Sequence, residues 1–495
     1  MNNTYCFFLR AAIVFSLIIL VSSCSYIDEK EAQLLDCDVT YSKSIIEVRS
    51  NTEELEDFTI TQEMAIYFAR SLKDRPDVIS IDTFDYHGIA CLYIINYKEG
   101  WIAIPTDSRA GISLGESQKE QLFLKDDLEN GIRVWLEINA ELVFNIIKSE
   151  AEEYDEKSVV LWQKIKNATD SSSTKSLEPE GPTWVRQTVS ITTTTQDTYT
   201  VDHLLTTEWG QGSPWNCTLP TDPAAQNGDT THFLTGCVPT AVSQILYYFH
   251  NDMGYPRDFW HSMIPSVVSQ DGYGRYTIAL SKNNYVSNSS RWSSMPETIN
   301  DSGVFQYVSD LMMDVGYRMN AKYSTNNNTI VNSVLVSPSQ NDLIPCGLSA
   351  QIGSYNYSTV RNNLLNSKPV FIAAHKLNNQ GEIGDGHAWV IDGVVDRTIS
   401  TATNYVYYVY QEGVLYPTGS EYLSDSDVLP YYPNAYDGMS VIETTYTYSH
   451  FLLMNFGYDG QYLDSLFSIE ESGSNWLSYD YQKFIYHNLS AGQLN

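Results

Sequence analysis

Hydrophobic and polar positions near the start of the chain predict a small mixed unit. The residues at 59–62 match a capping box, and the apolar positions after them recur at helical spacing up to Leu72. Two apolar runs, residues 90–95 and 101–104, flank Lys-Glu-Gly and predict a β-hairpin. A second helix is marked by Trp135, Ile138, Leu142 and Ile146. Together these elements predict a compact α+β unit at residues 50–166.

A change of composition divides the chain after this unit. Residues 167–183 are rich in Ser, Thr, Glu and Pro and show no apolar period, which predicts a linker and a site of proteolysis. From residue 184 to residue 495, helix-like and strand-like segments alternate without a repeat period. We therefore expect one large α+β domain after the linker.

The first 23 residues have the pattern of a signal peptide. Arg10 precedes an apolar run that is too short to cross a bilayer as a stable helix and that ends in Ser22-Ser23-Cys24. That ending resembles the lipobox of bacterial lipoproteins, which implies lipidation of Cys24 and an acidic tether at residues 24–49. We expect an exported protein, anchored to the outer membrane or the cell surface, with a cut in the linker releasing the C-terminal domain. A signal peptide cleaved elsewhere is the alternative.

Charge and cysteine usage exclude several classes of function. The formal net charge of −31 repels phosphate backbones, so nucleic-acid binding is disfavoured. None of the seven cysteines forms a C-x-x-C pair, and no His-Glu-x-x-His or Asp-rich loop occurs, so we predict neither a metal site nor a cofactor. An odd number of cysteines remains outside the signal region, so at least one exported thiol has no partner within the chain.

The most informative local pattern surrounds Cys237. The run Thr-Gly-Cys-Val-Pro-Thr-Ala at residues 235–241 is followed by apolar residues at helical spacing, which places Cys237 at a helix N-terminus. Helix amides and the positive end of the helix dipole lower the pKa of a thiol there and favour the thiolate. Taken alone, the pattern also fits a small buried structural cysteine.

A second pattern, far downstream, supports catalysis. The run Gly-His-Ala-Trp-Val-Ile-Asp-Gly at residues 386–393 places His387 on a strand. A papain-like cysteine peptidase needs its thiol on a central helix and its imidazole on the sheet that faces it. Gln211 can then donate its amide to an oxyanion, and Asn455 can accept from the imidazole and fix its orientation.

Four motifs in this order resemble the streptopain family of cysteine peptidases. They are Trp-Gly-Gln-x-x-Pro-aromatic-Asn at 209–216, Gly-Cys-Val-x-Thr-Ala at 236–241, Leu-Met-Met-Asp-Val-Gly at 311–316, and the run at 386–393. Upstream, residues 101–109 and 114–117 look like the propeptide of that family, which blocks the cleft until it is cut.

The resemblance implies an α+β, papain-like fold preceded by a small α+β propeptide domain. It implies an endopeptidase that acts on proteins, with Cys237 as nucleophile, His387 as base and then acid, Gln211 in the oxyanion hole and Asn455 as orienter. The propeptide would act as an intramolecular inhibitor. Three further residues are candidates for the substrate cleft, namely Gly236, Trp389 and Phe456.

Two departures from the family pattern concern Asn455. The family follows this residue with Trp-Gly-Trp-Gly-Gly, whereas this chain has Phe-Gly-Tyr-Asp-Gly at 456–460. Here His387 and Asn455 also lie further apart, because a Tyr-rich stretch around residues 398–445 is inserted, which we expect to form a loop beside the cleft.

Other interpretations stay open at this stage. His250 and His375 compete weakly with His387 as the base, and Cys217 and Cys346 are better explained as structural thiols. A surface binding protein with a decayed cleft would use the same scaffold, and so would a Cys-His acyl transferase with an acceptor other than water. The propeptide-like segment favours the peptidase.

Overall fold

The computed structural model describes residues 58–73, 75, 77–124, 128, 130–148, 156–169, 183–221, 232–254, 263–270, 275–282, 289–324, 330–331, 339–377, 383–411, 414–417, 441–468 and 481–491. These residues belong to one unit, Phe58–Asn495. The predicted signal peptide, the tether, Cys24 and linker residues 170–182 lie outside the described residues.

Residues 58–169, called here the N-terminal segment, contain the helices and strands expected for residues 50–166. Helix α4 runs to Thr169 and β5 begins at Thr183, so both ends of the linker predicted at 167–183 belong to regular elements. Helix α2 begins one residue after Thr61, whose hydroxyl accepts a hydrogen bond from Met64 N at 3.3 Å. The predicted cap at Thr59 is therefore wrong, because that residue forms a β-bridge with Asp107 instead. The elements of the segment are α2 (Gln62–Ser71), β1 (Val78–Tyr86), β2 (Ile89–Tyr97), β3 (Trp101–Pro105), η2 (Ser108–Ala110), β4 (Gly115–Ser117), α3 (Asn130–Lys148) and α4 (Glu156–Thr169).

The sheet of the N-terminal segment continues into the rest of the chain. Strands β1 to β4 pair antiparallel in sequence order, and β4 then pairs with β15 (Leu466–Phe467). Strand β15 also pairs with β14, so it joins the two halves in the order β1-β2-β3-β4-β15-β14-β12-β11-β16-β10. The strands of the second half are β5 (Thr183–Val201), β10 (Leu348–Ser354), β11 (Val370–Leu377), β12 (Ile383–Gln411), β13 (Val414–Pro417), β14 (Val441–Asn455) and β16 (Tyr481–Ala491).

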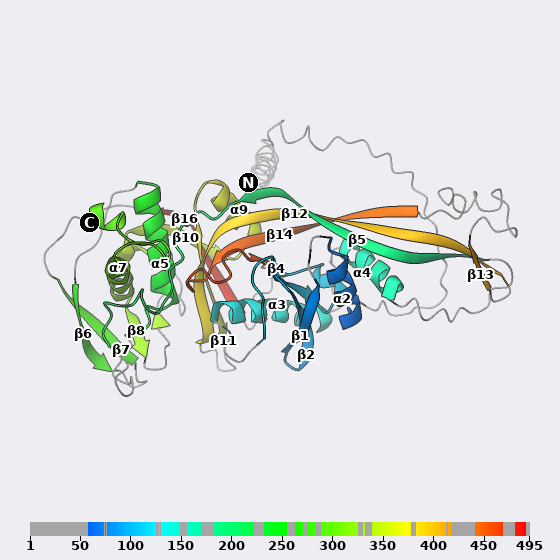
Figure 1. Cartoon of the computed structure of the whole chain (residues 1–495). Helices are drawn as coiled ribbons and strands as arrows, with labels where there is room; N and C mark the ends of the chain where they lie inside the picture. Colours follow the sequence, from blue (N-terminus) through cyan, green and yellow to red (C-terminus); the bar gives the residue numbers. More distant parts are fainter. Residues whose placement is uncertain are drawn as a thin grey trace, which may run out of the picture. The chain divides into compact units, whose positions relative to one another are not determined.

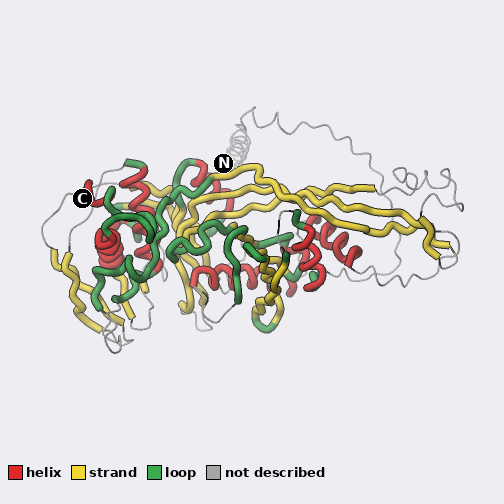
Figure 2. The backbone as a smooth tube through the Cα atoms, viewed as in Figure 1, coloured by secondary structure: helices red, strands yellow, loops and turns green. Residues whose placement is uncertain are grey.

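Three of these strands form a long ribbon beside the N-terminal segment (Figures 1 and 2). Strand β12 pairs with β5 on one side and with β14 on the other, and both ladders are antiparallel. Helices α2 and α4 contact β5, and α4 also contacts β14. The described parts of the inserted stretch thus form strands, and the expectation of a loop beside the cleft is wrong there. Alternating Thr and Tyr residues suit a half-buried strand surface.

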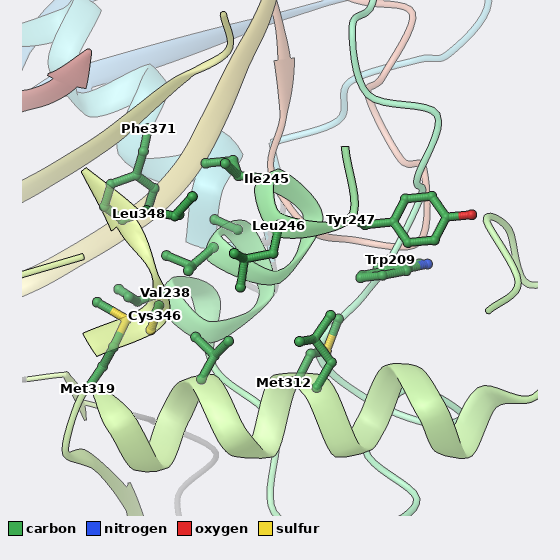
Figure 3. Packing of buried hydrophobic residues seen from close by; sticks show 14 of the residues in the cluster. Trp209, Val238, Ile245, Leu246, Tyr247, Met312, Met319, Cys346, Leu348 and Phe371 are labelled. Atoms are coloured by element: carbon green, nitrogen blue, oxygen red, sulfur yellow. The ribbon is translucent and has the colours of Figure 1, made fainter. Parts of the chain in front are cut away.

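The other part of the second half is mainly helical. Helix α5 (Cys237–Tyr247) packs against α7 (Phe305–Arg318) and against one face of the sheet. Figure 3 shows Val238, Ile245 and Leu246 of α5 between Met312 of α7 and Phe371 of β11. The remaining elements are η3 (Tyr248–Asp252), β6 (Met263–Gln270), β7 (Arg275–Lys282), α6 (Ser289–Trp292), β8 (Ala321–Ser324), β9 (Ile330–Val331), η4 (Ile344–Cys346) and α9 (Tyr357–Leu365).

Alternation along β12 distributes its side chains between two cores. Ala388 and Val390 lie in the cluster that contains α5. Trp389 and Ile391 point to the opposite face, into a cluster built with α3 of the N-terminal segment. His387 shares the face of Trp389, and its ring stacks on that indole at 6.0 Å between centroids. The His387 side chain therefore faces the N-terminal segment, whereas the side chains of Ala388 and Val390 face α5.

The predicted α+β class, with a helical part and an antiparallel sheet part after a small α+β unit, is confirmed. Among the helices that the structure describes, none is long and apolar enough to span a membrane.

Candidate active site

Cys237 occupies the first position of α5, as the sequence predicts. Its N-cap, Gly236, is buried and has φ of 90°, a conformation that favours glycine. The other residues of the helix are buried, whereas Cys237 is half-buried. Cys237 is therefore the least buried residue of the helix and lies at its N-terminal end.

Backbone amides surround the Cys237 thiol. They come from Val238 and Cys237 at the helix N-terminus and from Ala388 on β12, and each of them favours the thiolate. Burial outweighs them and raises the pKa of the Cys237 thiol. In this form the low thiol pKa expected from the helix position is not realised, because desolvation of the thiol outweighs the backbone amides.

His387 is held on β12 in a fully enclosed position. It is 2% exposed, and its Nε2 donates a hydrogen bond to the backbone carbonyl of Phe456 at 2.9 Å. Burial lowers the pKa of the ring to about 4, although the Phe456 carbonyl favours the charged form. The imidazole is therefore neutral near pH 7. Among the described contacts, it shares no hydrogen bond with the Cys237 thiol.

The opposite ring nitrogen of His387 faces a phenol. Tyr458 Oη lies 3.3 Å from His387 Nδ1, and the two rings stack at 5.2 Å and 21°. Gly131 N, in the first turn of α3, donates to the same hydroxyl at 2.9 Å. A Cβ added at Gly131 would lie 3.0 Å from His387 Cδ2 and 2.6 Å from Phe456 Cδ1. The start of α3 is therefore packed directly against the imidazole.

Gln211 is tied to the loop that carries the thiol. Its carbonyl accepts hydrogen bonds from Thr235 N at 3.0 Å and from Thr235 Oγ1 at 3.3 Å. Because Thr235 is two residues before Cys237, these bonds hold the backbone of Gln211 beside the start of α5. That position is compatible with the predicted role of its amide.

Asn455 lies behind the site rather than on the His387 ring. Its amide forms a reciprocal pair with Gln244 of α5, at 3.0 and 3.2 Å. It also donates to Thr207 O at 2.7 Å and accepts from Gly457 N at 3.1 Å. The structure thus does not bring Asn455 to the imidazole, and the carbonyl of the next residue, Phe456, holds the ring instead.

The three candidate cleft residues lie around the thiol and the imidazole. Gly236 precedes the thiol, and Trp389 and Phe456 pack on the His387 ring and on each other. Trp389 is 0% exposed and Phe456 is 2% exposed, in the cluster that includes α3. Access to a substrate would require α3 to leave.

The competing candidates, His250, His375, Cys217 and Cys346, have other surroundings. His250 stacks on Trp292, and His375 stacks on Phe484. Cys346 is buried, Cys217 is exposed, and the cysteines among the described residues are free. The described residues include no group of His, Cys, Asp or Glu that could hold a metal ion.

Two residues at the site were missed by sequence reasoning. Tyr458 was noted only as an aromatic that replaces the family's Trp, although a hydroxyl in place of an indole was a signal for a new hydrogen bond. Gly131 carried no recognisable signal, because a glycine near a predicted helix start has many explanations.

Comparisons with known proteins show the family of the chain. The model of the Peptidase C10 family matches residues 209–465, which include Gln211, Cys237, His387 and Asn455. A solved fragment of prointerpain A from Prevotella intermedia is similar, with 17% identity and a TM-score of 0.45, over 84% of this chain and 99% of that one. The curated proteins contain no match. The predicted resemblance to the streptopain family is confirmed, and the chain belongs to the Peptidase C10 family of cysteine peptidases.

Proposed function

We propose that the chain is the zymogen of a secreted cysteine endopeptidase, with the N-terminal segment as its propeptide. The observation that carries this proposal is the placement of Cys237 and His387. Cys237 stands at the start of α5, against the Ala388 amide of the strand that bears His387, while α3 covers the imidazole. A thiol and an imidazole on neighbouring elements can serve acyl transfer, and α3 packs against the imidazole.

In the active form, the Cys237 thiolate attacks the scissile carbonyl of a protein substrate. His387 takes the thiol proton and delivers it to the leaving amine, and water then releases the acyl-enzyme. The Cys237 amide and the Gln211 side chain stabilise the oxyanion. Asn455 is proposed as the orienter once the imidazole has turned toward the thiol.

The protonation states described above support latency. A thiolate–imidazolium pair needs a thiol pKa below that of the imidazole, whereas burial here raises the Cys237 pKa and lowers the His387 pKa to about 4. Both groups are neutral in this form. Removing α3 would admit water to the imidazole and would raise its pKa toward the ordinary value.

The N-terminal segment is held by more than the linker. Strand β4 pairs with β15, and α3 shares an apolar core with β11 and β12. Arg397 of the ribbon forms a buried ion pair with Glu116 of β4, which also pairs with Arg75 at 2.9 Å. These contacts suit an intramolecular inhibitor that must stay in place until it is cut.

Export and anchoring are part of the proposal and rest on the sequence alone. Ser22-Ser23-Cys24 supports lipidation of Cys24 and attachment to the outer membrane or the cell surface. A cut between residues 170 and 182 would leave the propeptide anchored and free the enzyme. Cys24→Ala should move the full-length precursor from the membrane fraction to the soluble fraction. Recovery of the mature enzyme with its lipid still attached would contradict release.

Casein hydrolysis under reducing conditions tests the activity. The chain without its signal peptide is compared with Cys237→Ala and with Cys217→Ala, which removes an exposed thiol in the neighbouring motif. We expect activity in the wild type and in Cys217→Ala, and none in Cys237→Ala. A wild type that stays inert after its linker is cut would favour a surface binding protein on the same scaffold.

A further inference from the structure

We infer that Tyr458 is a positioning residue for latency: its hydroxyl caps the base nitrogen of His387 and is itself held by the Gly131 amide of the N-terminal segment. This assignment rests on the proposed function. Steric cover alone would block no particular atom, whereas here one hydroxyl, that of Tyr458, blocks one ring nitrogen, His387 Nδ1.

The hydrogen bonds around the ring form a continuous chain with one direction. The carbonyl of Phe456 can only accept, so His387 Nε2 carries the ring proton. Nδ1 then presents its lone pair and accepts from Tyr458 Oη at 3.3 Å. The phenol oxygen in turn accepts from Gly131 N at 2.9 Å. In this series of hydrogen bonds every donor has an acceptor only while the imidazole is neutral, because a protonated Nδ1 could not accept from Tyr458.

The blocked atom is the one that catalysis needs. With Nε2 committed to the Phe456 carbonyl, Nδ1 is the ring nitrogen left to accept the Cys237 proton. The phenol is hydrogen-bonded to that lone pair. The buried ring is neutral and, with its proton on Nε2, has no other basic nitrogen. Cys237 cannot transfer its proton to His387 until the Tyr458 hydroxyl moves away.

The N-terminal segment contacts this cap through the Gly131 amide. Gly131 lies in the first turn of α3, where backbone N–H groups have no partner within the helix. Its missing Cβ lets the helix approach the ring closely enough for the bond to Tyr458. When α3 leaves, the hydroxyl loses its donor and can exchange His387 for water, while its ring can still shield the imidazole.

Alkylation of Cys237 by iodoacetamide tests this assignment without relying on proteolysis. The reagent reacts with the thiolate, so its rate reports whether the thiol can lose its proton. The intact chain is treated at pH 7, and the label on each cysteine is followed by mass spectrometry, with exposed Cys217 as the internal standard. Tyr458→Phe keeps the stacked ring and removes the hydroxyl. Tyr248→Phe is the matched control, because it removes a phenol that donates to Ser367 O at 2.9 Å, away from His387.

We expect Tyr458→Phe to speed Cys237 labelling about three- to tenfold, the range of one hydrogen bond, and Tyr248→Phe to leave it unchanged. Gly131→Ala should speed Cys237 labelling by a similar factor, because it disturbs the hydrogen bond from Gly131 N to the Tyr458 hydroxyl. The double variant should label no faster than the faster single one, because both changes break one connection. Equal rates for Tyr458→Phe and the control, or gains that multiply in the double variant, would overturn the assignment.

The same variants separate this inference from the proposed function. If labelling rises as expected but no chain hydrolyses casein after the linker is cut, the peptidase proposal fails and the role of Tyr458 stands. If casein is hydrolysed but Tyr458→Phe labels like the control, the role of Tyr458 fails and the peptidase stands.

Discussion

His387 Nε2 is bonded to the main-chain carbonyl of Phe456 at 2.9 Å, one residue beyond the asparagine that the motif order assigns as the orienter. The ring is thus fixed by a backbone carbonyl rather than by a side chain. The Asn455 amide is meanwhile engaged with Gln244, so it ties α5 to the strand that leads to Phe456.

This arrangement gives Asn455 and Gln244 a shared structural role that can be separated from catalysis. Asn455→Ala and Gln244→Ala should each lower the free energy of unfolding by about 1–3 kcal/mol, because each removes both buried hydrogen bonds of the amide pair. If Asn455 orients His387 after activation, its variant alone should lose further kcat/KM. Urea unfolding and peptide kinetics on the same proteins measure both effects, and equal kinetic losses would assign Asn455 to packing only.

Because Gly131 packs closely against Phe456 and His387, adding a methyl group there should weaken the binding of the propeptide to the rest of the chain. In Gly131→Ala the new Cβ overlaps the Phe456 ring, so α3 must move away. We expect this overlap to destabilise the packing of α3 by about 1–3 kcal/mol. A site-specific protease site placed between residues 170 and 182 allows the linker to be cut at will. After that cut, the segment should dissociate about tenfold faster or more, measured by size exclusion. Asn145→Ala on the same helix is the control and should dissociate at the wild-type rate.

The ion pair between Arg397 and Glu116 should hold the propeptide more strongly than a surface pair does. Both side chains are about 5–6% exposed. Glu116→Gln removes the charged partner that Arg397 and Arg75 share, while Arg397 keeps its ion pair with Asp197. We expect retention of the cut segment to weaken by about 1–3 kcal/mol. Lys119 and Asp464 form a second pair across the same junction at 2.7 Å, but they are 69% and 58% exposed. Lys119→Ala should therefore have little effect in the same dissociation assay, and equal losses would contradict this ranking.

The lowered pKa of His387 makes the closed form sensitive to acid. Its folded pKa is about 4 against an ordinary value of 6.5, so between these values the unfolded chain binds a proton that the closed form does not. Stability should therefore fall as the pH drops from 6.5 toward 4, by up to about 3 kcal/mol from this group. Urea unfolding at pH 7 and pH 5, in a Cys237→Ala background, measures the loss. His387→Gln should remove this part of the pH dependence. Burial also lowers the pKa of His375, so His375→Gln should remove a separate part and leave that of His387 in place. An unchanged slope in His387→Gln would contradict the pKa assignment.

Much of the site could be predicted because its chemistry is concentrated in short motifs. Glycine before Cys237 and helical spacing after it indicated the start of α5, and the apolar run around His387 indicated a strand. Gln211 could be placed beside them because its motif precedes the thiol in the family order. The α+β class followed from helical and alternating patterns in the two halves.

The remaining features depend on contacts that local patterns do not encode. Residues 398–411 of β12 and 441–445 of β14 belong to the stretch for which the sequence predicted an inserted loop, although Thr- and Tyr-rich alternation favours strands. The bond from His387 to Phe456 uses a backbone carbonyl, which any residue supplies, so sequence identity cannot reveal it. The meeting of Gly131 and Tyr458 joins positions far apart in the chain and depends on how α3 packs on the sheet.

The most direct test of the central claim follows casein hydrolysis and chain mass together in one sample of the chain without its signal peptide. If a Cys237 peptidase is held latent by residues 58–169, hydrolysis should begin after a lag. It should rise in step with loss of that segment, and Cys237→Ala should show neither process. Hydrolysis by the intact chain, or by Cys237→Ala, would contradict the account.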